Sequence, residues 1–333
     1  MSASVSIIVV NWNGRHHLNL CLSALFAQTY PNFEVTLVDN GSTDGSQTFV
    51  RDHFPDVRLI ELPQNMGFAR GNNVGIRASN ADYIATINND TKVAPNWLTA
   101  LVETAEANPN VGMCAAKLLF WDRPDVINSA GICLDRAGIA WDRLGGHPNE
   151  ISQTKPVPVF GASGGAALYR RTMLNQIGLF DEDFFAYLED VDLAWRARLA
   201  GWDCLFVDTA VIHHHHSATA IEGSPFKNRL LGRNKVWTIV KNYPWQLLLL
   251  YLPAILLYDL GAVAVALLAR RDVSPLVGRL QAIPKLPAMW QKRRKIQQSR
   301  TLPLKELRAL MEPISSPLKV WQRYQHLASG NPH

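Results

Sequence analysis

Short apolar runs alternate with segments of helical periodicity in the first ninety residues. The runs are rich in β-branched side chains, as in strands buried in a parallel sheet, and cover residues 5–10, 33–38, 57–62 and 83–87. After the first run, apolar residues recur at helical spacing (Leu18, Cys21, Leu22, Leu25 and Phe26). Because strand and helix alternate through short links, the sequence predicts an α/β fold with a mostly parallel sheet flanked by helices.

Polar residues follow the predicted strands directly. They are Asn11-Trp12-Asn13-Gly14 after the first strand, residues 39–45 (DNGSTDG) after the second and Asn88-Asn89-Asp90 after the fourth. In open α/β sheets, ligands bind at the carboxyl ends of the strands. Neither a GxGxxG fingerprint nor a Walker sequence is found. The glycine-rich segment 161–165 is either a place where the backbone approaches a substrate closely or a packing turn.

The stretch 178–201 (GLFDEDFFAYLEDVDLAWRARLAG) places many carboxylates among aromatic and apolar residues. Acidic groups occupy such surroundings when they are solvated, paired or used in chemistry. From Asp190 onward the spacing predicts a helix that ends at Gly201, so Glu189 and Asp190 lie at its N-terminus, where the dipole favours ionised carboxylates. Considered alone, this pair is either a helix cap in a solvated acidic turn or part of a reaction site.

Residues 112–160 are less regular and are expected to complete the sheet and shape a second half-site. Further on, two apolar runs, 205–207 and 210–212, lead into four consecutive histidines, His213 to His216. At the end of a strand, one of these histidines can bind a metal. A structural role is the alternative.

Residues 245–269 form an almost continuous apolar run, which is long enough to span a bilayer. Pro253, Asp259 and Gly261 interrupt it, and a central Asp is costly in lipid. Because basic residues flank the run on both sides, an interfacial or re-entrant insertion fits better than a single crossing. A true span and a buried core or dimer helix are the alternatives.

Charge is distributed unevenly along the chain of 333 residues. The net charge is +5, yet residues 270–333 contain 13 Lys and Arg against 3 Asp and Glu. A basic tail on an acidic body suggests a polyanionic partner surface. The neighbouring apolar run favours lipid over nucleic acid, and a solvated tail is the alternative. The four cysteines are widely separated and the N-terminus lacks a signal-peptide pattern, so we expect a reducing compartment.

The acidic positions indicate one common site when they are considered together. Asp39 and Asp90 each follow a predicted strand, and Glu189-Asp190 opens a later helix. Three acidic sites directed at one sheet edge suit a divalent cation with a phosphorylated ligand, together with a general base.

In these motifs the sequence closely resembles the family 2 glycosyltransferases of GT-A fold, especially bacterial rhamnosyltransferase-like members. The resemblance covers about residues 4–235 and runs in order through VSIIVVNWNG, VDNGSTDGS, NMGFARGNNVGI, INNDTKV, GASGGAALYRR, GLFDEDFFAYLEDVDLAWR and VIHHHHSAT. It implies a GT-A catalytic domain at 1–235. The remainder, 236–333, is expected to hold an apolar membrane-associated helical segment and a basic tail.

The resemblance also implies roles for individual residues. Asp190 is the expected catalytic base with Glu189 beside it, and Asp90 and His214 are the expected ligands of a divalent cation, Mg²⁺ or Mn²⁺. The expected donor-binding residues are Asn11, Asp39, Asn65, Arg70, Asn73 and Asn89. The expected acceptor side comprises Gly164, Gly165, Asp181 and Glu182. The DxD position reads Asn88-Asn89-Asp90 and lacks its first carboxylate, which implies a weaker or more substrate-dependent metal site.

The resulting hypothesis is an inverting, metal-dependent transfer of one sugar from a nucleotide-diphospho-sugar. The tail lacks the QxxRW element of processive synthases. By resemblance the leading donor is dTDP-rhamnose, and galactofuranose, mannose or glucose nucleotides stay open. The expected acceptor is a lipid-linked saccharide in cell-surface polysaccharide synthesis, at the cytoplasmic face of the cell membrane, with the protein peripheral or monotopic. A homo-oligomer stays open, and no nucleic-acid partner is expected.

Two other classes of protein compete with this hypothesis. A nucleotidyltransferase would begin with a Gly-rich, basic phosphate loop, which NWNG is not. A membrane-attached sugar-nucleotide-binding protein would bind the donor without turnover, and the complete set of Asp39, Asp90 and Asp190 argues against it.

Overall fold

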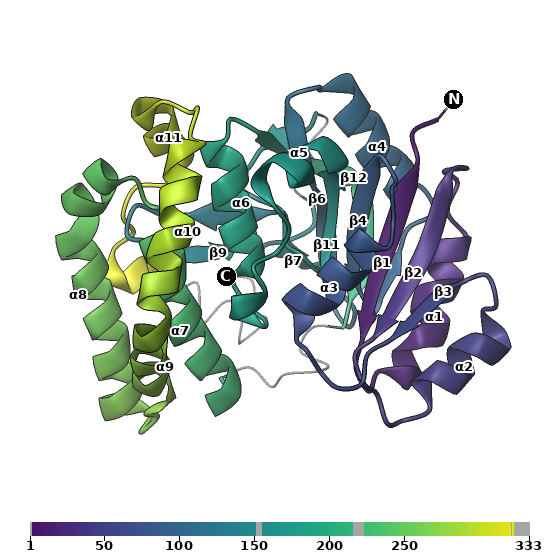
Figure 1. Ribbon diagram of the computed structural model, residues 1–333, viewed down its shortest axis with the longest axis horizontal. Coiled ribbons are helices and arrows are strands. Elements are labelled where there is room, and N and C mark those ends of the chain that lie inside the picture. The colour runs from purple at the N-terminus through teal and green to yellow at the C-terminus, as the bar shows by residue number, and fades with distance from the viewer. Residues whose placement is uncertain (1, 151–154, 216–222, 321, 323–333) are drawn as a thin grey trace.

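A ten-stranded sheet forms the centre of the molecule in the computed structural model (Figure 1). The structure describes residues 2–150, 155–215, 223–320 and 322. The strand order is β10-β12-β6-β11-β4-β1-β2-β3, with β5 beside β12 and β7 beside β6, while β8 and β9 form a separate hairpin. The strands are β1 (Val5–Asn11), β2 (Phe33–Asp39), β3 (Arg58–Glu61), β4 (Tyr83–Asn88), β5 (Thr91–Val93), β6 (Val111–Phe120), β7 (Ile127–Ser129), β8 (Ile132–Leu134), β9 (Ala140–Asp142), β10 (Val157–Pro158), β11 (Ala166–Arg170) and β12 (Asp203–His214).

The N-terminal half of the sheet is parallel and brings the polar strand ends together. β1 pairs in parallel with β2 and β4, and β2 with β3. In this register Asn11 lies opposite Asp39, and Val10 lies opposite Asn88. β11 then runs antiparallel between β4 and β6. The predicted α/β fold with a sheet flanked by helices is confirmed. The sheet mixes parallel with antiparallel strands, where the sequence predicted a mostly parallel one.

Helices cover both faces of the sheet because the strands alternate their side chains between two cores. On β1, Ile7 and Val9 belong to one core with α1 and α4, whereas Ile8 belongs to the other core with α3 and α6. The helices of this part are α1 (Arg15–Phe26), α2 (Ser46–His53), α3 (Phe68–Arg77), α4 (Trp97–Ala107), α5 (Arg171–Ile177) and α6 (Glu189–Leu199).

Two strands differ from the sequence pattern. β6 lies inside the region that looked irregular, yet all ten of its residues are buried, including Lys117. The two apolar runs before the histidines form one strand, β12, with a register shift between Val207 and Val211. Lys117 Nζ lies 2.6 Å from Asp208 Oδ1, so a buried ion pair stabilises this irregular segment.

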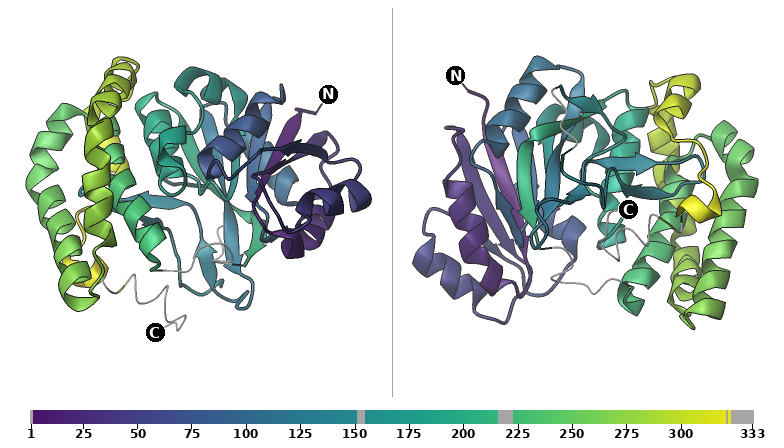
Figure 2. Two further views of the ribbon diagram at one scale, coloured as in Figure 1. Left: turned by 60° about the horizontal axis from the view of Figure 1, so that its bottom comes forward. Right: turned by 180° about the vertical axis from the view of Figure 1, so that it is seen from behind.

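The C-terminal helices form a second layer beside the sheet, and α8 is its outermost member (Figures 1 and 2). They are α7 (Pro225–Asn242), α8 (Trp245–Ala269), α9 (Ser274–Ala282), α10 (Leu286–Gln298) and α11 (Leu304–Leu310). α7 crosses the boundary expected at residue 235, and that domain division stays a prediction. Tyr243, Tyr251 and Ile255 join the core that contains α6. The layer is therefore packed against the α/β body and not tethered loosely to it.

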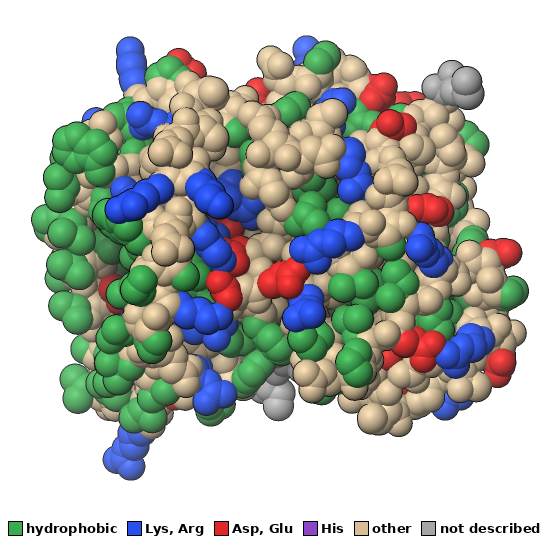
Figure 3. All heavy atoms as spheres, in the orientation of Figure 1, with side chains coloured by type: hydrophobic (Ala, Val, Ile, Leu, Met, Phe, Trp, Pro, Cys, Tyr) green, Lys and Arg blue, Asp and Glu red, His purple; other side chains and the backbone are tan. Residues whose placement is uncertain are grey.

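α8 is buried on one face and apolar on the other. Leu247, Tyr251 and Ile255 are four residues apart and face the body, while Leu257, Leu260 and the rest of the outer face are exposed. In the described part of the chain it is the one helix long and apolar enough to cross a membrane. Figure 3 shows hydrophobic side chains gathered along this edge of the molecule.

The charge inside the apolar run is neutralised within the helical layer. Asp259 of α8 accepts two hydrogen bonds of 2.6 Å from Arg279 of α9, and Lys235 of α7 lies 3.3 Å away. The cost expected for a central Asp in lipid is thus avoided by pairing within the protein.

Candidate active site

Asp190 stands in the first turn of α6 with its carboxylate fixed by two backbone amides. Gly164 N donates to Asp190 Oδ2 at 3.0 Å, and Val191 N donates to Asp190 Oδ1 at 2.7 Å. Burial raises the pKa of Asp190, both amides lower it, and the nearby charge of Asp142 raises it further. The net shift is upward, which suits a general base better than an ordinary surface Asp.

The neighbouring Glu189 points into the protein. It is only 5% exposed, and its Oε2 is buried without a hydrogen-bond partner in the described structure. Burial, followed by the charge of Asp190, raises the pKa of Glu189 well above its usual range. A buried acid of this kind favours its protonated form. The geometry therefore makes Asp190, and not Glu189, the candidate for proton abstraction.

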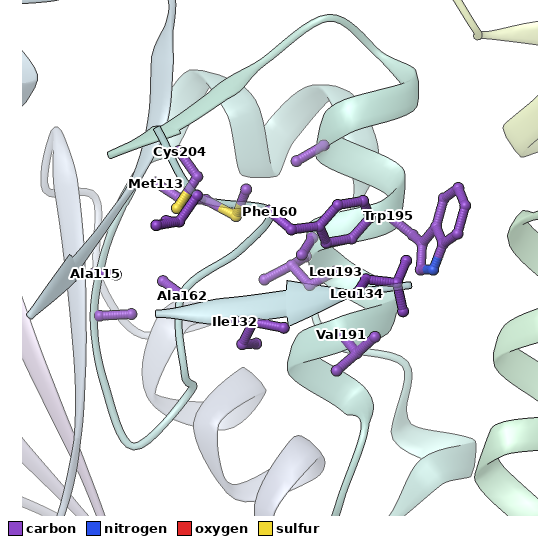
Figure 4. Close-up of a cluster of buried hydrophobic side chains, with 14 of the residues drawn as sticks. Met113, Ala115, Ile132, Leu134, Phe160, Ala162, Val191, Leu193, Trp195 and Cys204 are labelled. Carbon is purple, nitrogen blue, oxygen red and sulfur yellow. The ribbon is translucent and has the colours of Figure 1, made fainter. Parts of the chain in front are cut away.

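Apolar packing fixes α6 behind these acids. Figure 4 shows Val191, Leu193 and Trp195 of α6 among Ile132 and Leu134 of β8. Trp195 also packs against the Tyr243 ring, with 4.8 Å between centroids. The candidate base is thus carried by a helix that is buried along most of its length.

An unusual turn, residues 184–188, feeds the chain into α6. Phe185, Tyr187 and Leu188 all have positive φ angles, of 66°, 68° and 64°. Phe185 has ψ −67°, and Ala186 N donates to Phe184 O at 2.8 Å, which defines the rare, strained form of γ-turn. Each such residue costs about 1–3 kcal/mol and persists only where its surroundings hold it, most often at functional sites.

The glycine-rich segment 161–165 connects Asp190 to the end of β4. Gly165 O accepts from Asn88 N at 2.9 Å, and a Cβ on Gly165 would lie 2.8 Å from the Asn88 amide. A Cβ on Gly164 would lie 3.4 Å from Asp190 Cβ. The segment is therefore a close backbone contact between the two predicted halves of the site.

Asp90 and His214 are brought together, as the resemblance implies. His214 Nε2 lies 3.3 Å from Asp90 Oδ1, and Asn128 Oδ1 lies 2.9 Å from His214 Nδ1. If Nδ1 carries the proton donated to Asn128, Nε2 presents a lone pair towards the carboxylate. Two acceptors that face each other in this way fit a shared divalent cation, and a hydrogen bond on the other ring nitrogen, here Nδ1, is typical of a metal-binding histidine. His216 lies outside the described residues.

Two ligands are fewer than a complete metal site needs. No group of three or more His, Cys, Asp or Glu side chains in the described structure is arranged to hold a metal. Mg²⁺ and Mn²⁺ accept carboxylate and water ligands, and Mg²⁺ commonly completes its shell with substrate phosphates. Asp90 and His214 therefore fit a cation that binds together with a diphosphate.

The predicted donor residues Asn11, Asp39 and Asn89 form one buried network. Asn11 Nδ2 donates to Asp39 Oδ2 at 3.0 Å, and Asn89 Nδ2 donates to Asn11 Oδ1 at 2.7 Å. Asp39 Oδ1 also accepts from Ser42 N and from Gln47. Gly14 is required here because a Cβ would lie 2.1 Å from the Asn89 amide. Asp39 is fully buried, so contact with the donor requires this loop to open, and the donor-binding role stays a prediction.

The other three predicted donor residues are placed differently. Asn65 Oδ1 accepts from Asn40 and from Gly67 N, so it shapes its own loop. Arg70 is half exposed, 3.8 Å from Glu182. Asn73 is fully buried, and its amide exchanges hydrogen bonds with the Phe180 backbone. Both ends of the Asn73 side chain are therefore used within the protein, and its role in binding the donor stays a prediction.

The predicted acceptor residues Asp181 and Glu182 are ion-paired. Asp181 binds Lys241 and Lys292, each at 2.5 Å, and Glu182 accepts from Asn73 and Arg77. Burial alone would raise the pKa of Asp181, but the two lysines outweigh it and lower its pKa. Asp181 thus binds the C-terminal helices to the loop before α6, and a role in contacting acceptor hydroxyls is not favoured by this geometry.

A comparison with protein families decides what kind of site this is. The model of glycosyl transferase family 2 matches residues 6–178, which contain Asp39, Asp90 and the glycine-rich segment. The chain belongs to glycosyl transferase family 2. It is a glycosyltransferase, and the rhamnosyltransferase-like resemblance is also confirmed by a relative.

That family 2 relative is the N-acetylglucosaminyl-diphospho-decaprenol L-rhamnosyltransferase of Mycobacterium tuberculosis. It is 29% identical over 238 residues, which are 65% of this chain and 77% of the relative. The low-salt glycan biosynthesis hexosyltransferase Agl10 of Haloferax volcanii is 25% identical over 72% of this chain and 78% of its own length.

Solved structures show the same fold. The mannosyltransferase PcManGT of Pyrobaculum calidifontis, in complex with GDP-Man and Mn²⁺, covers 99% of this chain and 86% of its own chain, with TM-score 0.53 and 18% identity. TarS 1–349 of S. aureus with UDP covers 89% and 90%, with TM-score 0.56 and 17% identity. At these identities the likeness establishes the GT-A fold of the family 2 chain and no substrate.

Several residues near the site belong to none of the sequence motifs named above. Asn128 behind His214, Asp142 beside Asp190, and Asn234 of α7 lie far from the motifs along the chain. Asn128 and Asp142 come from the region of irregular pattern, and Asn234 from the segment before the apolar run. Only the tertiary contacts reveal them.

Proposed function

We propose that this protein transfers one sugar from a nucleotide-diphospho-sugar to a hydroxyl of a lipid-linked saccharide, with inversion at the anomeric carbon. The observation that carries the proposal is the continuous chain of contacts between Asp190 and Asp90. Asp190 is bonded to Gly164, Gly165 to Asn88, and Asn88 lies 3.5 Å from His214, which faces Asp90. This continuity supports a base for the acceptor and a place for the donor diphosphate at one edge of the sheet.

In the proposed reaction, Asp190 accepts the proton of the acceptor hydroxyl as its oxygen attacks the anomeric carbon. The bond from that carbon to the diphosphate oxygen breaks, and the nucleoside diphosphate leaves with the electron pair. The two backbone amides on Asp190 keep its carboxylate oriented. A cation, Mg²⁺ or Mn²⁺, held by Asp90 and His214 would supply positive charge at the diphosphate.

The donor is proposed to be dTDP-rhamnose, because the Mycobacterium tuberculosis relative is named a rhamnosyltransferase acting on a decaprenol-linked sugar. The same name supports a polyprenyl-diphosphate saccharide as acceptor and a role in cell-surface glycan synthesis. Galactofuranose, mannose and glucose nucleotides are the competing donors.

The membrane part of the proposal rests on the outer face of α8 and α9. Leu249, Leu257 and Leu268 of α8 are exposed. Val273, the residue before α9, and Leu280 on α9 are exposed as well. The inner face of α8 is packed on the body, and Asp259 is paired within it. A helix held in this way supports peripheral or monotopic binding over a span. The exposed Arg270 and Arg271 beside it favour an anionic leaflet, which we place at the cytoplasmic face.

A panel of nucleotide sugars tests the function. Thermal shift and donor hydrolysis would be measured with each sugar nucleotide, with and without Mn²⁺, on wild type and on Asp190→Asn. We expect dTDP-rhamnose to give the largest shift, with cation present, and Asp190→Asn to bind it but to turn over 10²–10⁴-fold more slowly, the range typical of a lost general base. The matched control is Asp52→Asn, which changes an exposed Asp of α2.

The outcomes separate the candidate functions. Turnover by Asp190→Asn within a few-fold of wild type contradicts the base assignment. Binding of a sugar nucleotide with no transfer by the wild-type protein to any acceptor favours the rival function, a membrane-attached sugar-nucleotide-binding protein. Activity that a chelator leaves unchanged contradicts the cation.

A further inference from the structure

The turn 184–188 is held from outside by α7, a helix to which the reaction assigns no role. Phe184 O accepts three hydrogen bonds, from Ala186 N at 2.8 Å, Arg233 Nη2 at 2.8 Å and Asn234 Nδ2 at 3.0 Å. Two of the three donors belong to α7. The carbonyl that accepts the closing hydrogen bond of the strained γ-turn therefore takes most of its hydrogen bonds from the C-terminal layer.

Asn234 is the centre of this contact. Ala186 O and Tyr187 O also lie 2.8 Å and 2.7 Å from its amide nitrogen, so three carbonyls of one turn converge on a single NH₂ group and share its two N–H donors. The side chain is fully buried, and its Oδ1 accepts from Arg233 Nε at 3.0 Å. Such convergence requires the backbone to reverse within a few residues, which is what the positive φ angles do.

The opposite side of the turn is fixed by the donor half of the site. Phe185 O accepts from Ala69 N at 3.1 Å, at the start of α3. Gly67 lies against the same residue so closely that a Cβ would be 2.5 Å from Phe185 O. The turn is thus held between α3 and α7, and Asp190 follows it by two residues.

We propose that Asn234 is a positioning residue for the general base. By holding the three carbonyls of the turn 184–188, it fixes where α6 begins and therefore where the Asp190 carboxylate lies against Gly164. This inference rests on the proposed function, in which Asp190 removes the acceptor proton. Asn234 is fully buried against the turn and acts only through it.

A double-mutant cycle tests the proposal. Asn234→Ala and Asp190→Asn would be made singly and together, and kcat measured at saturating donor and acceptor. We expect Asn234→Ala to lower kcat by about 10–100-fold, because a displacement of about 1 Å at a catalytic group can cost 10²-fold. If Asn234 acts through Asp190, the double variant is no slower than Asp190→Asn alone.

Asn242→Ala is the matched control. Asn242 lies two turns further along α7, is equally buried, and donates to Asp192 of α6 and not to the turn. We expect it to lower the melting temperature about as much as Asn234→Ala while kcat stays within a few-fold of wild type. Hydrogen exchange of the segment 184–190 should rise in Asn234→Ala only.

Each outcome decides the proposal. An additive loss in the double variant, or equal kcat losses for the two Asn variants, makes Asn234 a general packing residue and overturns it. If Asn234→Ala does not fold, Arg233→Met removes the arginine donor to Phe184 O and Asp183 O and the one to Asn234 Oδ1, but leaves the Asn234 amide on the turn. A few-fold, non-additive loss is then expected. If Asp190→Asn is itself fully active, the proposed function fails first, and a kcat loss in Asn234→Ala alone then contradicts action through Asp190.

Discussion

The ionisation of Asp190 should set the acidic limit of activity. Burial, followed by the charge of Asp142, raises the pKa of Asp190, and the base must be deprotonated to act. As pH falls through that raised pKa, kcat/KM should therefore be lost above the pH at which a free Asp titrates, about 3.9. Asp142→Asn removes one of the charges that raise the pKa of Asp190. The acidic limb of the pH profile, where kcat/KM falls with falling pH, should therefore move to lower pH.

The measurement is a kcat/KM profile that runs from about pH 4, near the pKa of a free Asp, up to about pH 8. Asp52→Asn, which removes a carboxylate from the exposed surface of α2, is the control and should leave the limb in place. A limb that is unchanged in Asp142→Asn would mean that Asp142 does not influence the base.

A second prediction concerns the histidine beside Asp90. Asn128 Oδ1 lies 2.9 Å from His214 Nδ1 and so fixes the ring. Loss of such an outer-shell bond typically weakens metal affinity 10–100-fold, so we expect Asn128→Ala to bind Mn²⁺ that much more weakly in the presence of a nucleoside diphosphate. Electron paramagnetic resonance of free Mn²⁺ measures it. Ser129→Ala, on the same strand, should bind normally, and equal affinities in both variants would contradict the role of Asn128.

At the scale of elements, local pattern was sufficient where neighbours in sequence decide the structure. The first four strands and the polar ends after β1, β2 and β4 follow from short apolar runs and connections. β6 and the unbroken β12 were not predictable, because Lys117 and Asp208 break the apolar pattern and are tolerated only as a buried pair between two strands. The turn 184–188 could not be predicted from the sequence, because none of its positive-φ residues is Gly.

The same distinction applies to the site. The pair of Asp90 and His214 was predictable by resemblance because both residues belong to recognisable motifs. The burial of Asn73 and the ion pairs of Asp181 were not, because their partners lie far along the chain, Phe180 for Asn73 and Lys292 for Asp181. Side chains that hold a loop and side chains that bind a ligand are of the same polar types, and only tertiary contacts separate them.

A buried cluster of charged side chains joins α6 to α7, and its contribution to the stability of the fold should depend on pH. Lys241 lies 2.7 Å from Asp192 and 2.5 Å from Asp181. Burial opposes ionisation of both acids, but the lysine outweighs it and lowers their pKa values. Lowered pKa values stabilise the fold above the pKa of the unfolded acid, about 3.9, and this stability is lost as pH falls through the folded pKa.

Lys241→Met should therefore cost about 3 kcal/mol at pH 7, the lower end of the range for breaking a buried pair, since Lys292 and Arg196 still contact the acids. At about pH 3, where unpaired carboxylates are protonated, the difference from wild type should shrink. Urea unfolding at both pH values measures this, with the exposed Lys305→Met as control. A difference that does not change with pH would show that the cluster is not ionised as described.

At the scale of the whole molecule, the C-terminal layer has a polar inner face and an apolar outer face. Its inner face carries the side chains that contact the loop before α6, including Asn234, Lys241 and Lys292. Figure 3 shows basic and acidic side chains gathered near the middle of the molecule and apolar ones along the α8 edge. The surface proposed to dock on lipid and the surface proposed to position the base therefore belong to the same few helices.

This arrangement changes how the membrane prediction is best tested. Truncation near Asn242 would remove Tyr243, Tyr251 and Ile255 from the core, so substitutions on the outer face are cleaner. Leu257→Asp together with Leu260→Asp changes two side chains that are 68% and 66% exposed. We expect wild type to float with vesicles that contain anionic lipid and the double variant to remain in the soluble fraction, because charged groups oppose insertion of the apolar face. Phe26→Asp, an exposed apolar residue on α1, should float like wild type. If the double variant still floats, or if wild type does not float and instead forms a dimer that the double variant loses in sedimentation, the outer face of α8 is not a membrane surface.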